Sequence, residues 1–220
     1  MTRFLIPVGV IAFFIVAAAV SHDSNSATAS TSSSADKPQR DFVWPPQVGQ
    51  RFPNVAFVDQ HGTTVHLQDL QGRILLIEPI GMPCEACQAF VGGHEHGGFG
   101  GVQPQPDMPS IDELARTYGG VDLNDPRILK VQLLLFSLDM TAPAAKDAQR
   151  WADHFGIANS ADHLVLAGND SLLDADTFRL IPGFWLVDED FVVRADSCGH
   201  HSHDDLYRDL LPALGPLLNE

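Results

Sequence analysis

The sequence is poor in basic residues. It has 13 Lys and Arg against 28 Asp and Glu, which gives a formal net charge of −15 at pH 7, and the basic residues are scattered without a run. Nucleic-acid binding depends on basic side chains that neutralise phosphates, so this balance excludes nucleic acid as a partner. The acidic surplus predicts a well-solvated surface.

Long hydrophobic runs are absent beyond residue 20. The one such run, residues 4–20, follows Arg3 and includes Ala17-Ala18-Ala19, a sequence that suits signal peptidase. Residues 1–22 are therefore either a signal peptide or an N-terminal membrane anchor. Both alternatives predict a periplasmic or otherwise extracytoplasmic protein, which an anchor would tether to the inner membrane through residues 4–20.

Large apolar residues are also scarce just after this segment. Residues 23–41 are rich in Ser, Ala, Thr and Asp and are expected to form a flexible tether. Residues 42–220 are expected to form one domain, because a hydrophobic fraction of 45% is sufficient for a core. The sequence has no Gly-x-Ser-x-Gly turn, which argues against a Ser-His-Asp hydrolase.

Cysteine is rare, with three residues in the whole chain, yet two of them are close together. Residues 74–77 form an apolar run of strand length, and Cys84-Glu-Ala-Cys87 follows after a short turn. This spacing puts one thiol at a helix N-terminus, where unpaired N–H groups favour the thiolate. Such a pair can form a disulfide or bind a soft metal ion.

The remaining pattern alternates strands with helices, which predicts a mixed α/β sheet. Strands are expected over residues 55–58, 64–67, 74–77, 131–136, 163–166, 184–187 and 191–194. Helices are expected over 110–118 and 143–155, and a last helix is expected to be capped by Asp204. Residues 92–109, rich in Gly, Pro and His, are expected to be an irregular insertion.

Residues 46–220 resemble the thioredoxin-like superfamily, on its redoxin branch of TlpA/ResA-like and Sco-like exported proteins. The resemblance rests on four stretches in a fixed order: Val48-Gly-Gln-Arg-Phe-Pro53 with Phe57-Val-Asp59 and Gly62; residues 72–87; Leu135-Phe-Ser-Leu-Asp139 before Trp151-Ala-Asp-His-Phe-Gly156; and Ile181-Pro-Gly-Phe-Trp-Leu-Val-Asp188.

The resemblance implies a thioredoxin-like fold, in which helices flank a central mixed sheet, with an N-terminal hairpin and a Gly/His-rich insertion after the start of the CxxC helix. It also implies that Cys84 attacks, that Cys87 resolves, and that Pro182 is a cis-proline beside them. A proline at this place is otherwise an ordinary way to start a strand.

Two departures from the pattern bear on function. Pro83 stands where many thioredoxin-like reductants carry Trp. Sco-like copper chaperones have three residues between their cysteines and a His ahead of the final hairpin, whereas this chain has two between and no His in residues 171–181. The Pro-x-x-x-Thr-x-x-Cys pattern of peroxiredoxins does not fit residues 79–84.

The third cysteine lies in a His-rich segment. Cys198 precedes His200, His201 and His203, and the insertion carries His94 and His96. By the resemblance, the loop around Cys198 lies beside the CxxC turn. Thiolate and imidazole together suit copper or zinc, so these residues, with Cys84 and Cys87, are candidate metal ligands. The alternative is that the histidines are solvated and Cys198 is a free thiol or a dimer contact.

Three functions are therefore to be distinguished. The first is thiol-disulfide exchange through Cys84 and Cys87, which needs no cofactor and acts on a protein thiol or disulfide, with a membrane reductant as a further partner. The second is a Sco-like chaperone that binds copper (or zinc) and delivers it to a metalloenzyme. The third, a redox-silent binding module, is disfavoured by the retained cysteine pair.

Overall fold

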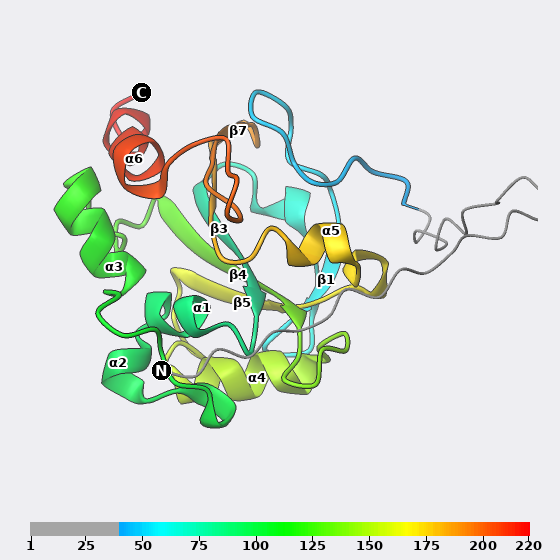
Figure 1. The fold of residues 1–220 in the computed structure, drawn as a ribbon. Helices are drawn as coiled ribbons and strands as arrows, with labels where there is room; N and C mark the ends of the chain where they lie inside the picture. Colours follow the sequence, from blue (N-terminus) through cyan, green and yellow to red (C-terminus); the bar gives the residue numbers. More distant parts are fainter. Residues whose placement is uncertain (1–39) are drawn as a thin grey trace, which may run out of the picture. The chain divides into compact units, whose positions relative to one another are not determined.

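A seven-stranded mixed sheet runs through the centre of the molecule in the computed structural model, which describes residues 40–220 (Figure 1). The predictions for residues 1–22 and for most of the tether lie outside the described residues. The strand order is β2-β1-β5-β4-β3-β6-β7. The strands are β1 (Ala56–Asp59), β2 (Thr64–His66), β3 (Ile74–Gly81), β4 (Ile128–Phe136), β5 (His163–Ala167), β6 (Trp185–Val187) and β7 (Val193–Asp196).

The central strands β3, β4 and β5 are parallel, and the pairs toward both edges are antiparallel. Every residue of β3 and β4 is buried. This matches their nearly continuous apolar sequences, because a parallel strand in the middle of a sheet is covered on both faces. The expected mixed α/β sheet is confirmed.

Helices and short helical turns connect and cover the strands. They are η1 (Leu67–Leu70), α1 (Glu85–Phe90), α2 (Gly93–His96), η2 (Phe99–Gly101), α3 (Ile111–Leu114), η3 (Ala115–Gly119), α4 (Ala145–His154), η4 (Asp170–Leu172), α5 (Ala175–Phe178), η5 (Leu206–Leu210) and α6 (Leu211–Leu217). No helix within residues 40–220 is long and apolar enough to cross a membrane.

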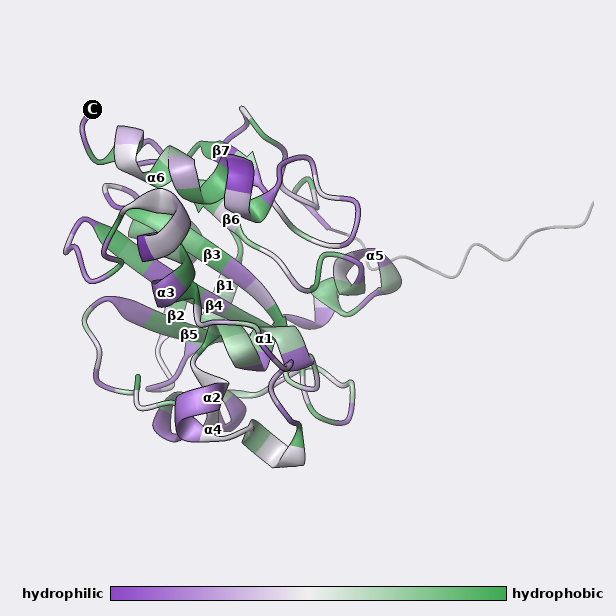
Figure 2. Ribbon diagram, turned by 60° about the vertical axis from the view of Figure 1, so that its left-hand side comes forward, coloured by the Kyte–Doolittle hydropathy of each residue, from purple (hydrophilic) through white to green (hydrophobic). Residues whose placement is uncertain are grey.

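The sheet separates two apolar layers. Alternate residues of β3 such as Ile74 and Leu76 pack with Leu114 of α3 and Leu211 of α6, and these helices lie side by side (Figure 1). The opposite residues, such as Leu75, pack in the larger core, which includes α4 and the segment before β1. Figure 2 shows hydrophobic residues concentrated along the central strands and hydrophilic ones on α2.

Most of the expected elements are present, and Ser110 caps α3 by accepting a hydrogen bond from Glu113 N–H at 3.4 Å. Several predicted boundaries are wrong: β3 continues to Gly81 instead of ending at residue 77, β4 begins at Ile128 instead of residue 131, and the insertion expected to be irregular contains α2 and η2. Asp205, not Asp204, caps the last helix, because Asp204 accepts instead from Asp196 N–H at 2.8 Å. The last strand begins at Val193 rather than residue 191, because Phe191 has a φ of 68° and belongs to the preceding turn.

Candidate functional site

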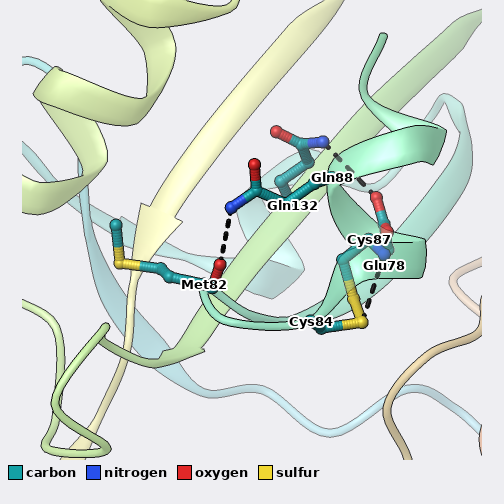
Figure 3. Close-up of a disulfide and its surroundings, with 6 residues drawn as sticks. All are labelled: Glu78, Met82, Cys84, Cys87, Gln88 and Gln132. Atoms are coloured by element: carbon teal, nitrogen blue, oxygen red, sulfur yellow. Dashed lines mark hydrogen bonds between the residues drawn. A yellow bond between two sulfur atoms is a disulfide. The ribbon is translucent and has the colours of Figure 1, made fainter. Parts of the chain in front are cut away.

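The CxxC pair lies where the central strand β3 ends and α1 begins. Strand β3 stops at Gly81, and two backbone bonds close the turn: Met82 N–H donates to the carbonyl of Phe136, and Cys84 N–H donates to that of Gly81, both at 2.8 Å. Cys84 is then the N-cap of α1, and its Sγ accepts a hydrogen bond from Cys87 N–H at 3.1 Å (Figure 3). The turn therefore fixes Cys84 at a helix start.

Cys84 and Cys87 are joined by a disulfide, with their Cα atoms 5.3 Å apart. The two sulfurs differ in exposure: Cys84 is half-buried, whereas Cys87 is fully buried. Since thiol-disulfide exchange requires access to the attacking sulfur, Cys84 is the one that a substrate can reach. The buried Cys87 can react only with Cys84.

A buried carboxyl group, Glu78, lies in the surroundings of the disulfide (Figure 3). It sits in the middle of β3 and is 2% exposed. Its Oε2 accepts a hydrogen bond from Gln132 Nε2 at 3.4 Å, and its Oε1 has no hydrogen-bond partner within the described part of the chain. Burial raises the pKa of Glu78 well above the usual 4.5. A buried carboxyl group of this kind can exchange a proton with a neighbouring group.

Glu78 was not among the site residues predicted from the sequence, although the sequence carries a signal for it. It is the one ionisable residue in the run of eight that forms β3, and an unpaired carboxyl group is costly at such a position. A charged residue inside a fully buried strand is a mark of a functional site.

Pro182 lies beside the CxxC turn, and the Ile181–Pro182 peptide bond is cis, as the resemblance implies. A Cβ added to Gly81 would lie 3.6 Å from Ile181 Cδ1, so the cis-proline loop touches the end of β3. The next residue, Gly183, is required by close packing, because a Cβ there would lie 2.3 Å from the Cα of Cys198. The role of Pro182 in substrate pairing stays a prediction.

Cys198 is adjacent to this loop. The thiol is free and buried, and Cys198 N–H donates to Asp196 Oδ1 at 2.9 Å. Burial raises its pKa well above the usual value, and the carboxyl groups of Asp196 and Glu78 raise it further. Its thiol would therefore have to lose a proton before it could bind a metal ion.

The five candidate histidines are exposed. In the loop after β7, His203 Nδ1 lies 3.0 Å from Asp204 Oδ2, and this hydrogen bond raises the pKa of His203. In the insertion, His94 Nε2 lies 3.0 Å from the carbonyl oxygen of Gln105, and the ring of His96 packs edge-on to Phe155. The described residues contain no group of three or more His, Cys, Asp or Glu arranged to hold a metal ion.

The insertion after α1 is attached to the CxxC helix by Gln88, another residue that the sequence analysis missed. The Gln88 side chain is fully buried, and its Nε2 donates to the carbonyl of Met82 at 2.8 Å (Figure 3). The same amide pairs with Phe99 in the insertion. No local signal in the sequence marks Gln88, because its partner Phe99 reaches it only in the folded chain.

This chain is similar in fold to several proteins of known structure. No protein-family model matches the sequence, and no curated protein matches it. A thiol:disulfide interchange protein from Bacteroides sp. is 16% identical, with a TM-score of 0.48 over 80% of this chain and 92% of that one. The thioredoxin domain of a thiol-disulfide oxidoreductase from Bacteroides vulgatus is 17% identical, with a TM-score of 0.43 over 73% and 93%.

A third similar structure is Arabidopsis thaliana ScoI with copper bound, which is 12% identical, with a TM-score of 0.46 over 77% of this chain and 99% of that one. At these identities and TM-scores the likenesses carry no argument about function. The chain's own architecture is thioredoxin-like: a mixed sheet, a CxxC disulfide where a helix follows a central strand, and a cis-proline loop beside it.

Proposed function

We propose that this chain is a thiol-disulfide oxidoreductase that exchanges disulfides with protein substrates through Cys84 and Cys87. The observation that carries the proposal is the unequal burial of one linked pair: Cys84 is half-buried at the start of α1, and Cys87 is fully buried behind it. An inert structural disulfide is the alternative. A bridge that closes so small a loop removes little entropy from the unfolded chain, so that role would gain little.

In the reduced protein, the Cys84 thiolate attacks one sulfur of a substrate disulfide. The substrate S–S bond breaks, a Cys84–substrate bond forms, and the released substrate sulfur takes up a proton. Cys87 then attacks Cys84 Sγ, which releases the second substrate thiol and forms the Cys84–Cys87 disulfide. Two electrons pass from the protein to the substrate, and an external dithiol reductant restores the dithiol.

Glu78 is the group that accepts the proton of Cys87 in this scheme. It is a buried carboxyl group, one of whose oxygens has no hydrogen-bond partner among residues 40–220, and burial raises its pKa, which makes its carboxylate a stronger base. When the exchange runs backwards, Glu78 returns the proton to Cys87 and the substrate dithiol is oxidised.

The place of action is part of the proposal. Residues 1–22 have the composition of an export signal or anchor, and dithiol chemistry is ordinary outside the cytosol. We place the domain on the extracytoplasmic side of the inner membrane, with protein thiols and disulfides as substrates and a membrane reductant as its partner.

Equilibration with glutathione tests the proposal. The full-length protein is incubated in glutathione buffers of graded redox ratio, and the state of Cys84 and Cys87 is read by alkylation and mass spectrometry. We expect a reversible two-electron transition and turnover with a disulfide-containing protein such as insulin, both abolished by Cys84→Ser. A pair that stays oxidised in every buffer and shows no turnover would identify a structural bridge.

Copper or zinc binding stays a prediction, and the described arrangement does not fit a resident metal. Cys198 is a buried thiol, and the described residues contain no group of three or more His, Cys, Asp or Glu that could hold the ion. Titration of the reduced protein with Cu(I) and Zn(II) against a chelator distinguishes the two functions. Tight one-to-one binding that is lost in both Cys84→Ser and a His200/His201/His203→Ala variant would establish the chaperone function. Binding that is unchanged in the histidine variant would not.

A further inference from the structure

Gln132 lies next to Glu78 in the sheet and is itself buried, with 3% of its surface exposed. Glu78 and Gln132 are direct partners in the parallel register of β3 and β4, so their side chains leave the same face of the sheet. The amide of Gln132 has two ends, and each end faces a different side chain: Glu78 on one side and Trp151 of α4 on the other.

The orientation of this amide follows from the chemistry of Trp151. The indole Nε1–H is a donor and has no acceptor counterpart, and it lies 3.0 Å from Gln132 Oε1. The atom facing the indole must therefore be the amide oxygen, which turns the NH₂ group toward Glu78. Trp151 is fully buried and is held between the rings of Phe99 and Phe155, at centroid distances of 5.5 Å and 4.7 Å.

We propose that Gln132 is a positioning residue for the dithiol exchange: Trp151 fixes its amide so that an N–H donor always faces the carboxyl group of Glu78. The inference rests on the proposed function, because it concerns how the base for Cys87 is held. A donor aimed at a carboxylate favours its charged form, which is the form that accepts a proton. Gln132 thereby opposes the effect of burial and keeps Glu78 usable as a base.

Other titratable and charged groups also surround Glu78. Cys87 of α1 lies near Glu78 in Figure 3, and Cys198 of the loop after β7, which is hydrogen-bonded to Asp196, interacts with Glu78 through its charge. Lys130 and His163 line a cavity of about 10 Å³ beside Glu78. The ammonium of Lys130 is paired with Asp112 at 2.8 Å. Variants of Gln132 and Trp151 leave all these groups in place, so a changed pH profile would report the amide itself.

The test is the rate at which the reduced full-length protein is oxidised by glutathione disulfide between pH 5 and pH 9. The variants are Gln132→Leu, which removes the donor, and Trp151→Phe, which removes the N–H that fixes the amide. Gln60→Leu is the matched control, because Gln60 is a buried amide that accepts from Val165 N–H at 3.0 Å in another part of the sheet.

We expect Gln132→Leu to move the midpoint of the profile to higher pH by about one unit, the size of one hydrogen bond to a charged group. Trp151→Phe should give a smaller shift in the same direction, and Gln60→Leu none. In a Glu78→Gln background, Gln132→Leu should cause no shift. Gln132→Met, closer in shape, is the substitute if the Leu variant fails to fold.

An unchanged midpoint in the Gln132 variants, whether or not the rate falls, would overturn the inference and leave Gln132 with a packing role. Failure of the proposed function has a different signature, since the wild-type protein would then show no exchange at any pH.

Discussion

The side-chain amide of Gln88 pairs with both backbone groups of Phe99. Phe99 N–H donates to Gln88 Oε1 at 2.6 Å, and Gln88 Nε2 donates to the Phe99 carbonyl at 3.1 Å. A third bond, from the same Nε2 to the carbonyl of Met82, reaches the turn that carries Cys84. One buried side chain therefore links the insertion to the active-site turn.

Gln88→Leu should destabilise the protein by about 2–3 kcal/mol, because the buried backbone groups of Phe99 and Met82 lose their partner. Denaturant unfolding measures the loss. Gln149→Leu on the exposed face of α4 is the matched control and should have an effect near zero. Equal stability of the two variants would show that the insertion does not depend on Gln88.

Glu78 should make the protein less stable as pH rises. The unfolded chain releases this proton near pH 4.5, while the folded protein retains it to a higher pH, because burial raises the pKa of Glu78. The folded state binds more protons over that interval, so its free energy of unfolding falls between pH 4.5 and the raised pKa.

Glu78→Gln should remove this loss of stability. The stability of the variant relative to wild type should therefore be higher at pH 8 than at pH 5. Thermal unfolding at the two pH values measures it. Glu113→Gln, an exposed substitution on α3, is the control. A Glu78→Gln effect that is the same at both pH values would contradict the raised pKa.

His163 should make the protein less stable as the pH falls, the opposite of the effect of Glu78. Burial, and then the charge of Lys130, lower the pKa of His163 from 6.5 to about 3. The unfolded chain binds this proton below pH 6.5 and the folded protein does not, so stability falls as pH falls through that interval. At pH 5 the loss from His163 is about 2 kcal/mol.

His163→Leu should flatten the loss of stability between pH 7 and pH 5, as measured by denaturant unfolding at each pH. The exposed His61→Leu should keep the wild-type slope. If His163→Leu also keeps that slope, His163 is protonated in the folded state and the lowered pKa is wrong.

The parts of the fold that the sequence predicted are those with strong local signals. Two short apolar runs, residues 74–77 and 131–136, predicted the central strands, and the family resemblance implied that Pro182 lies beside Cys84 and Cys87. The cap of the last helix was mispredicted because neighbouring aspartates, Asp204 and Asp205, have the same local preference. The choice between them depends on Asp196, which reaches Asp204 only in the folded sheet.

The parts of the site that the sequence did not predict are contacts between distant segments. Gln88 is hydrogen-bonded to Phe99, and Gln132 to Trp151, only because folding brings these segments together. The predicted metal site of histidines was not found among the described residues for a related reason. Two His-rich loops were inferred to be near the same turn, but proximity of loops does not determine where exposed side chains point.

Trapping of a mixed disulfide tests the central claim most directly. The full-length Cys87→Ser variant, with Cys84 reduced, is mixed with a disulfide-containing protein substrate, and the adduct is mapped by mass spectrometry under non-reducing conditions. We predict a covalent adduct at Cys84, because the resolving thiol is missing, and none with Cys84→Ser under the same conditions. Failure of Cys87→Ser to form any adduct, or an adduct at Cys198 instead, would contradict the account.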